Sequence, residues 1–176
     1  MDGEQWLAAC HPDPAAVYRQ WGGPPHLARL PTGKHFAALR LFQPLGLTVL
    51  WELGDQADKV PVLEEHARPR PFFYLLMQPT DSDADSDAWP SEQDATFLGA
   101  GDEFTAPSPH ADGITGVQQH SFMWRVAPDG SGRLADPDAL RAALRLARDC
   151  DRQAARIRAA RSVFYGAKHT KHTRQT

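Results

Sequence analysis

The feature that most limits how this chain can fold is one long amphipathic pattern near its C-terminus. After Pro137 the sequence contains no glycine or proline until Gly166. Asp136 and Pro137 are favourable residues for the N-cap and the first turn of a helix. At 100° per residue, apolar side chains gather on one side of such a helix. They are Leu140, Ala143, Leu144, Leu146, Ala147, Cys150, Ala154 and Ile157. We therefore predict a helix over 137–165 with one face against a core, which gives Cys150 a buried, apolar role.

The opposite side of this predicted helix carries arginines. Five of them fall within a stripe about 80° wide, namely Arg141, Arg145, Arg148, Arg152 and Arg156. Further basic residues follow, namely Arg158, Arg161, Lys168, Lys171 and Arg174. Residues 152–176 hold 7 basic and no acidic residues, which leaves 19 − 7 = 12 basic and 22 acidic residues in 1–151. An acidic body with a basic end indicates a polyanionic partner, DNA or RNA. The alternative is that the arginines only keep the helix solvated.

The end of the helical pattern supports a different class of function. By helical phase, Arg158 and Arg161 move onto the apolar side, so the core-facing stripe ends near Ile157. Three apolar residues lie beyond that point, Val163, Phe164 and Tyr165. On a projecting helix they form a docking patch for a protein partner or a second copy. The alternative hypothesis is therefore an interaction or assembly module without nucleic-acid binding. We expect residues 166–176 to form a basic, disordered tail.

The body, residues 1–136, reads as an α+β or α/β domain built on a small mixed sheet with flanking helices. Helical signals cover 14–21 and 44–53, and strand signals cover 35–42, 71–77 and 120–126. Shorter apolar runs at 60–63 and 97–105 add strand candidates. The segment 79–95 is acidic and rich in serine, and we predict an exposed loop there, with 81–94 as its most polar part.

Composition limits the class of protein further. The chain has no run of 18 apolar residues and no signal-peptide pattern, which predicts no membrane span. Its two cysteines are far apart, and we expect a reducing, cytoplasmic location. Trp21, Trp51 and Trp124 end apolar runs and are predicted to lie in the core. Trp89 lies in the acidic loop, where we predict an exposed side chain that contacts a partner.

Motifs for catalysis, cofactors or metals are weak. The histidines are isolated, and the acidic loop has calcium-like spacing but Ser86 where the loop needs glycine. We therefore predict no metal and no cofactor. A third hypothesis is an enzyme of unfamiliar chemistry, which would use Asp102 and Glu103 after a glycine turn, with His110 or His120 as its histidine. Such a pair beside a turn is more often a solvated corner.

Several short motifs occur in an order that resembles a known family. They are Leu-Pro-Thr-Gly at 30–33, Gly-Ala-Gly-Asp at 99–102 with Thr105-Ala-Pro107, Trp124-Arg-Val126-Ala-Pro128, and Leu134-Ala-Asp136-Pro137 with Leu140. Over residues 15–147 the chain is similar to small actinobacterial primase-polymerase-like proteins, relatives of the N-terminal domain of bifunctional DNA primase/polymerases.

This resemblance implies a primase-polymerase fold but not its chemistry. Active members hold metal ions with two carboxylates spaced i, i+2 on one strand, where both point to the same face. In this chain the matching strand reads His35-Phe-Ala-Ala-Leu-Arg40 and contains no carboxylate. Arg68 and Arg70 flank the strand 71–77, where the family contacts phosphate. The resemblance therefore implies a degenerate, non-catalytic member.

Overall fold

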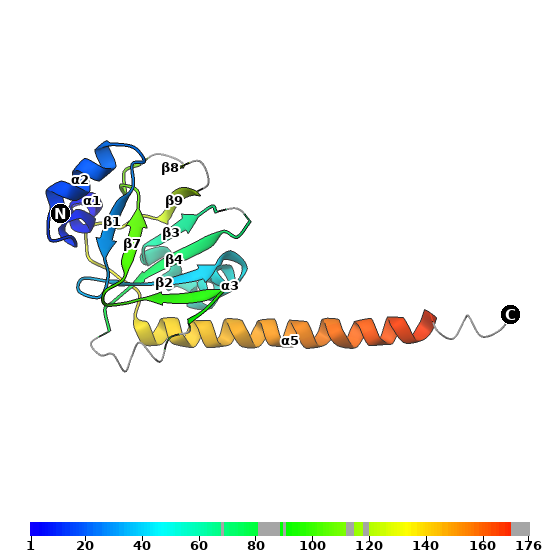
Figure 1. Cartoon of the computed structure of the whole chain (residues 1–176). Coiled ribbons are helices and arrows are strands. Elements are labelled where there is room, and N and C mark those ends of the chain that lie inside the picture. The colour runs from blue at the N-terminus through cyan, green and yellow to red at the C-terminus, as the bar shows by residue number, and fades with distance from the viewer. Residues whose placement is uncertain (68, 81–88, 90, 112–114, 118–119, 170–176) are drawn as a thin grey trace.

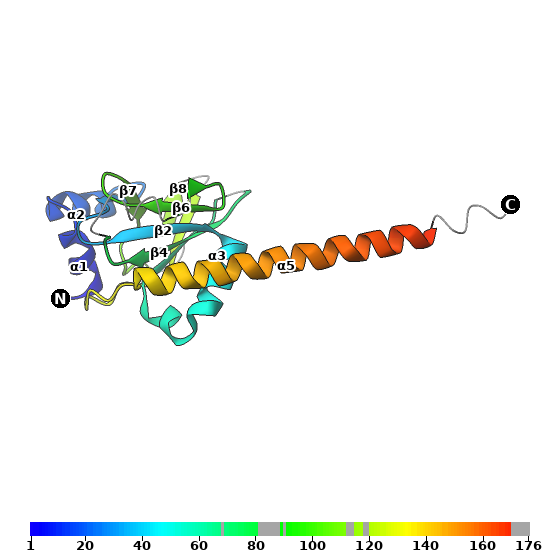
Figure 2. The same ribbon diagram turned by 90° about the horizontal axis from the view of Figure 1, so that it is seen from below.

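The fold is described from a computed structural model of the chain (Figure 1). The structure describes residues 1–67, 69–80, 89, 91–111, 115–117 and 120–169. It has an α+β architecture, as the sequence predicts, with a long C-terminal helix that runs along the body and projects past it (Figures 1 and 2).

Two short helices open the chain. Helix α1 (Gly3–Ala9) starts at a capping box, in which the Asp2 side chain accepts from the Gln5 amide and the Gln5 side chain accepts from the Asp2 amide. Helix α2 (Pro14–Gly22) follows the N-cap Asp13 and has proline in its first turn. The sequence predicted α2 and missed α1.

The main sheet has seven strands in the order β5-β6-β2-β4-β3-β9-β8. Every pair of neighbours in it is antiparallel, so the expected mixed sheet is wrong. Among the described residues, an isolated parallel bridge joins Met77, at the end of β4, to Ala135. The strands are β2 (Ala37–Phe42), β3 (Val62–Glu65), β4 (Phe72–Met77), β5 (Ser91–Glu92), β6 (Ala95–Leu98), β8 (Thr115–Val117) and β9 (His120–Val126).

A second sheet consists of β1 (Ala28–Pro31) paired antiparallel with β7 (Glu103–Ala106). Together with α1 and α2 it covers one face of the main sheet (Figure 1). Phe104 is fully buried in this layer and meets Phe36 edge-on, with their ring centroids 5.6 Å apart. The Trp21 indole N–H donates to the Ala106 carbonyl at 3.0 Å, which joins α2 to the small sheet.

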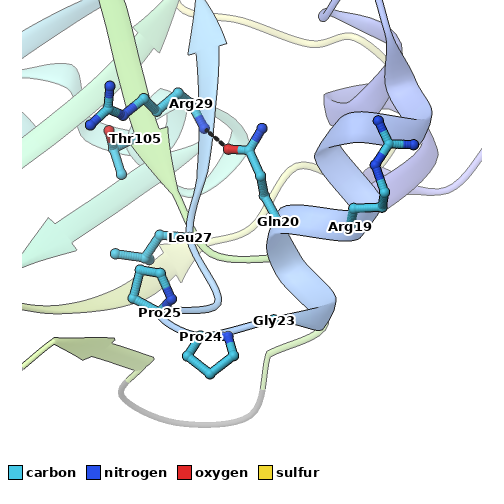
Figure 3. A pocket seen from close by; sticks show the side chains of 8 residues that line it. All are labelled: Arg19, Gln20, Gly23, Pro24, Pro25, Leu27, Arg29 and Thr105. Carbon is cyan, nitrogen blue, oxygen red and sulfur yellow. Dashed lines mark hydrogen bonds between the residues drawn. The ribbon is translucent and has the colours of Figure 1, made fainter.

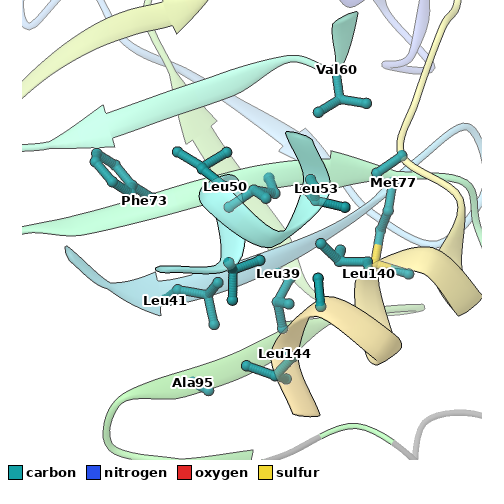
Figure 4. Packing of buried hydrophobic residues seen from close by; sticks show 14 of the residues in the cluster. Leu39, Leu41, Leu50, Leu53, Val60, Phe73, Met77, Ala95, Leu140 and Leu144 are labelled. Atoms are coloured by element: carbon teal, nitrogen blue, oxygen red, sulfur yellow. The ribbon is translucent and has the colours of Figure 1, made fainter. Parts of the chain in front are cut away.

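The other face of the main sheet is covered by α3 (Gln43–Leu53) and by the start of α5 (Pro137–His169), which contact each other (Figures 2 and 4). A short 3-10 helix, η1 (Gly54–Lys59), follows α3. The alternation of β2 divides its residues between the two faces, so that Leu39 and Leu41 lie on the α3–α5 side and Ala38 on the other.

Helix α5 begins at Pro137, as predicted, with the Asp136 carboxylate accepting from the Ala139 amide at 2.8 Å. Its core face has the spacing i, i+3, i+4, i+7 and consists of Leu140, Ala143, Leu144 and Ala147. These residues pack against β2, β4 and α3 (Figure 4). The first turns of α5 therefore belong to the core of the body, and the predicted boundary at residue 136 does not separate two packing units. The helix also continues to His169, past the predicted end at 165.

Two tryptophans contradict their predictions. Trp51, expected in the core, is 83% exposed, because it lies on the face of α3 opposite the buried Leu45 and Val49. Trp89, expected to be exposed in the acidic loop, is 5% exposed and stacks on Phe97 with ring centroids 5.4 Å apart. The rest of the predicted loop, 81–88 and 90, lies outside the described residues, while Ser91–Glu92 forms β5.

Candidate functional site

The projecting part of α5 is the candidate site, because it extends from the body and its described side chains are exposed (Figures 1 and 2). Every residue from Asp149 to Ala159 is exposed. At 1.5 Å per residue, the segment Cys150–His169 is about 30 Å long. Its chemistry must therefore be sought on its exposed surface.

Two of the predicted stripe arginines are tied to the body. The Arg141 guanidinium lies 5.1 Å from the centroid of the Trp89 ring and 3.6 Å from the Asp138 carboxylate. Arg148 lies 3.8 Å from the Asp94 carboxylate. Their side chains are only 24% and 27% exposed. These two arginines help to fasten α5 along the β6 side of the sheet, which corrects their prediction as part of a free cationic stripe.

Arg152 forms an ion pair within the helix, with Asp149 one turn before it. Its side chain is 68% exposed, so the pair sits in water. Exposed pairs of this kind contribute about 0–1 kcal/mol. A phosphate competing for the Arg152 guanidinium would therefore face a weak intramolecular partner.

The remaining described arginines of α5 are Arg145, Arg156 and Arg158, and all three are exposed. Within the described part of the chain, none of them lies within 4.0 Å of an acidic side chain. Arg145 and Arg156 share a face of the helix and lie about 16 Å apart along its axis. Arg158 lies on the side that continues the core stripe.

The other predicted basic residues are only partly placed. Arg161 and Lys168 lie within α5, as do the proposed docking residues Val163, Phe164 and Tyr165, but the structure describes only the backbone there. Lys171 and Arg174 lie outside the described residues. The nucleic-acid hypothesis and the docking-patch hypothesis for this end of the chain therefore both stay predictions.

An apolar stripe on another face of α5 was assigned wrongly by the sequence pattern. Leu146 and Ile157, expected against the core, are 52% and 51% exposed, and Cys150, also expected to be buried, is exposed. The reason is geometric, since Leu146 is turned about 100° from the core face, and Cys150 and Ile157 lie beyond the end of the body near Arg148. Helical periodicity shows which residues share a face, but not how far along the helix the body extends.

The residues of the enzyme hypothesis have structural partners. The Asp102 carboxylate accepts from the Gly99 amide at 2.9 Å and so closes the turn before β7. Glu103 lies 3.8 Å from Arg29, and His110 lies 3.9 Å from Glu4. The side chain of His120 is not among those described. Among the described residues no group of three or more histidine, cysteine, aspartate or glutamate residues is arranged to hold a metal ion.

Sequence reasoning missed two buried carboxylates on β3. Glu64 and Glu65 are each 7% exposed and point to opposite faces of the sheet. Glu64 accepts from Arg125 at 3.1 Å. On the other face, the Tyr74 hydroxyl donates to Glu65 at 2.7 Å and accepts from Arg40 at 3.0 Å.

Each of these carboxylates has a structural role on its own face of the sheet, because each has an arginine beside it. The Arg40 guanidinium also covers the Phe72 ring at 3.4 Å from its centroid. Burial, with the neighbouring Glu65 charge adding to it, raises the pKa of Tyr74, so its hydroxyl stays a proton donor. No sequence signal marks these contacts, since the pairing of β3 with β4 and β9 creates them.

The described residues of the body form clefts that include the following two. One of about 380 Å³ is lined by residues of α2, β1 and β7, shown in Figure 3. Its two arginines do not converge, since Arg19 pairs with Asp13 at 3.2 Å and Arg29 with Glu103 at 3.8 Å. A second cleft of about 330 Å³ lies beside α3 and includes Trp51 and Arg125, the latter committed to Glu64. Neither cleft presents a set of free polar groups for a small ligand.

The strand for which the sequence resemblance predicted a primase-polymerase motif is β2, whose residues Ala37, Ala38 and Leu39 are fully buried. Two arginines precede β4 in the chain. Arg68 lies outside the described residues, and the Arg70 guanidinium lies 4.9 Å from the centroid of the Phe42 ring. Within the described residues, no helix has the length and apolar character needed to cross a membrane. Comparisons with protein families, with curated proteins and with solved structures found no match, so the suggested family stays a prediction.

Proposed function

We propose that this chain is a non-catalytic, primase-polymerase-like binding module that contacts nucleic acid through α5. The observation that carries the proposal is the exposed basic surface of a helix that leaves an acidic body. Arg145, Arg156 and Arg158 supply described guanidinium groups for it. The order of the short motifs supports the primase-polymerase-like body, and the absence of a carboxylate pair in its matching strand supports a non-catalytic role.

The distribution of charge explains why the contact would be confined to the helix. Residues 1–151 carry 12 basic and 22 acidic residues, so the body repels phosphate groups as a whole. Residues 152–176 carry 7 basic and no acidic residues. A polyanion is therefore steered toward the arm, because the field of the acidic body is screened over about 8 Å in physiological salt.

The geometry also gives an expected salt dependence of nucleic-acid binding. The rise between Arg145 and Arg156 is about 16 Å, which spans about five phosphates of one DNA strand at 3.4 Å each. If Arg158, which lies on another side of the helix, meets a phosphate as well as Arg145 and Arg156, log affinity falls against log salt with a slope of about −3. The further basic residues of 161–174 would bring it to about −6 if all of them met phosphates.

The test is fluorescence anisotropy of a labelled DNA duplex titrated with the protein over a series of salt concentrations. The triple variant Arg145→Gln, Arg156→Gln and Arg158→Gln removes the described contacts, and we expect its salt slope to flatten by about 3. The matched control removes the same charge from the body, through Arg19→Gln, Arg29→Gln and Arg133→Gln, and should leave the slope unchanged.

Two results would overturn this proposal. One is an affinity of the unmodified protein that does not change with salt. The other is an equal loss in both triple variants, because that would mean that overall charge, and not the surface of α5, governs binding. A single-stranded RNA of the same length, measured in parallel, distinguishes between the two kinds of nucleic acid.

A further inference from the structure

The exposed apolar stripe of α5 repeats with a period of seven residues. Leu146, Cys150, Gln153 and Ile157 are spaced 4, 3 and 4 residues apart, and all four are exposed. Three of the four are apolar. In the sequence the same alternation continues with Ala160, Phe164 and Ala167, in a segment that remains helical. An apolar repeat of 3.5 residues is the pattern by which one helix packs lengthwise against another.

The stripe does not serve the body's own core. The core face ends at Ala147, and by helical phase the exposed stripe is turned about 100° away from it. It also lies about 100° from the face that carries Arg145 and Arg156. The helix thus has three separate surfaces: one for the body, one basic and one apolar.

Charges beside the stripe indicate which helix would cover it. Asp149 and Arg156 flank the stripe on the same side, one near each end of Leu146–Ile157. If a second α5 runs antiparallel, with Leu146 facing Ile157 of the second copy, Asp149 of each chain lies opposite Arg156 of the other. The pattern is therefore self-complementary in both its apolar and its charged positions.

A parallel arrangement lacks this complementarity. In a parallel, in-register pair, Arg156 of one chain would lie opposite position 161 of the other, which is also arginine. Like charges at such flanking positions oppose pairing. The weak in-helix pair between Arg152 and Asp149 does not alter this preference, because Arg152 lies farther from the stripe.

We propose that two copies of this chain associate through an antiparallel pair of α5 helices, crossing near Asp151 and Arg152. Leu146 of each copy packs against Ile157 of the other, and Cys150 of each faces Gln153 of the other. The two bodies then lie at opposite ends of the pair. Arg145 remains on the outer surface, whereas Arg156 lies at the seam opposite Asp149 of the other copy. The inference rests on the apolar stripe and its flanking charges, so it goes beyond the proposed function and does not depend on it.

The first experiment measures molecular mass by analytical ultracentrifugation as a function of protein concentration, without nucleic acid. We expect the mass to rise from 19.5 kDa toward twice that value. The variant Leu146→Gln, Ile157→Gln removes four apolar side chains from each dimer and should weaken association at least about 100-fold. Its charge is unchanged, so binding to nucleic acid can be measured separately on the same variant.

The matched control is Ala155→Gln with Ala159→Gln, two exposed positions on a different face of the same helix. This variant should dimerise like the unmodified protein, and circular dichroism should show equal helix content in both variants. A monomeric mass at every concentration overturns the proposal, as does an equal loss of association in the control variant.

The second experiment tests the orientation by disulfide formation. One protein carries Leu146→Cys and Cys150→Ser, and the other, with a size tag, carries Ile157→Cys and Cys150→Ser. The antiparallel pair predicts cross-links between the two proteins and none within either alone. Cross-links within each protein alone would show a parallel pair and overturn the proposed arrangement.

Discussion

Leu140 and Leu146 lie on the same helix, and the apolar pattern assigns both to the core, yet the structure gives them opposite environments. Leu140 is fully buried, and Leu146 is 52% exposed. Replacing each by alanine therefore compares the same chemical change at two sites. We expect the free energy of unfolding to fall much more at Leu140 than at Leu146.

The expected magnitudes follow from burial. Leu140→Ala removes apolar atoms from the cluster between α5, α3 and the sheet and leaves a cavity, which costs about 3–5 kcal/mol. At Leu146 about half of the side chain is already in water, so the loss is about 1 kcal/mol or less. Alanine's higher helix propensity offsets a small part of that loss.

The assay is urea-induced unfolding followed by tryptophan fluorescence, at a protein concentration low enough to keep the chain monomeric. Under that condition, any contribution of Leu146 to association between copies is excluded. Equal losses at the two positions, or a larger loss at Leu146, would refute the packing of α5 described above. Such a result would mean that the helix meets the body along a different face.

Two further predictions concern single side chains. Burial raises the pKa of the Cys10 thiol to about 12, whereas Cys150 is exposed. Alkylation of the native protein near pH 8 should therefore modify Cys150 alone and reach Cys10 only after unfolding. Modification of both cysteines at equal rates would contradict this prediction. Tyr74→Phe removes the hydroxyl between Glu65 and Arg40 and should cost about 1–3 kcal/mol in urea unfolding, and Tyr18→Phe, at a 42% exposed tyrosine, is the control that should cost much less. Because the pKa of Tyr74 is raised in the folded protein, its neutral hydroxyl contributes stability below about pH 10, the pKa of an unfolded tyrosine, and this stability is lost as the pH rises further. The variant Tyr74→Phe has no hydroxyl to ionise and should therefore unfold less in alkali.

Local sequence signals predicted those elements whose cause is local. Pro14 and Pro137 lie in the first turn of helices that begin at those residues, and an apolar run predicted the central strand β4. Local sequence signals could not predict the small sheet, because its two strands, β1 and β7, are separated by most of the body in sequence. Helix α1 was missed because its main signal is a reciprocal pair of side-chain bonds between Asp2 and Gln5.

The candidate site was predicted in part. The sequence showed that α5 carries arginines on one side, but it did not show that Arg141 and Arg148 turn back to Trp89 and Asp94. That contact depends on the position of β6 and of the segment before it, which periodicity in α5 does not encode. Trp51 and Trp89 exchanged their expected environments for the same reason, since tertiary neighbours decide burial for large aromatic residues.

The borders of the seven-stranded sheet bear on how copies of the chain meet. At one border lies β5, two residues long, and at the other lies β8, three residues long. Strands this short offer few unpaired amides and carbonyls to a neighbouring molecule, which is how natural sheets avoid growing edge to edge into aggregates. The sheet is therefore poorly suited to recruiting another chain by strand addition, and concentrated solutions should stay free of fibrillar material.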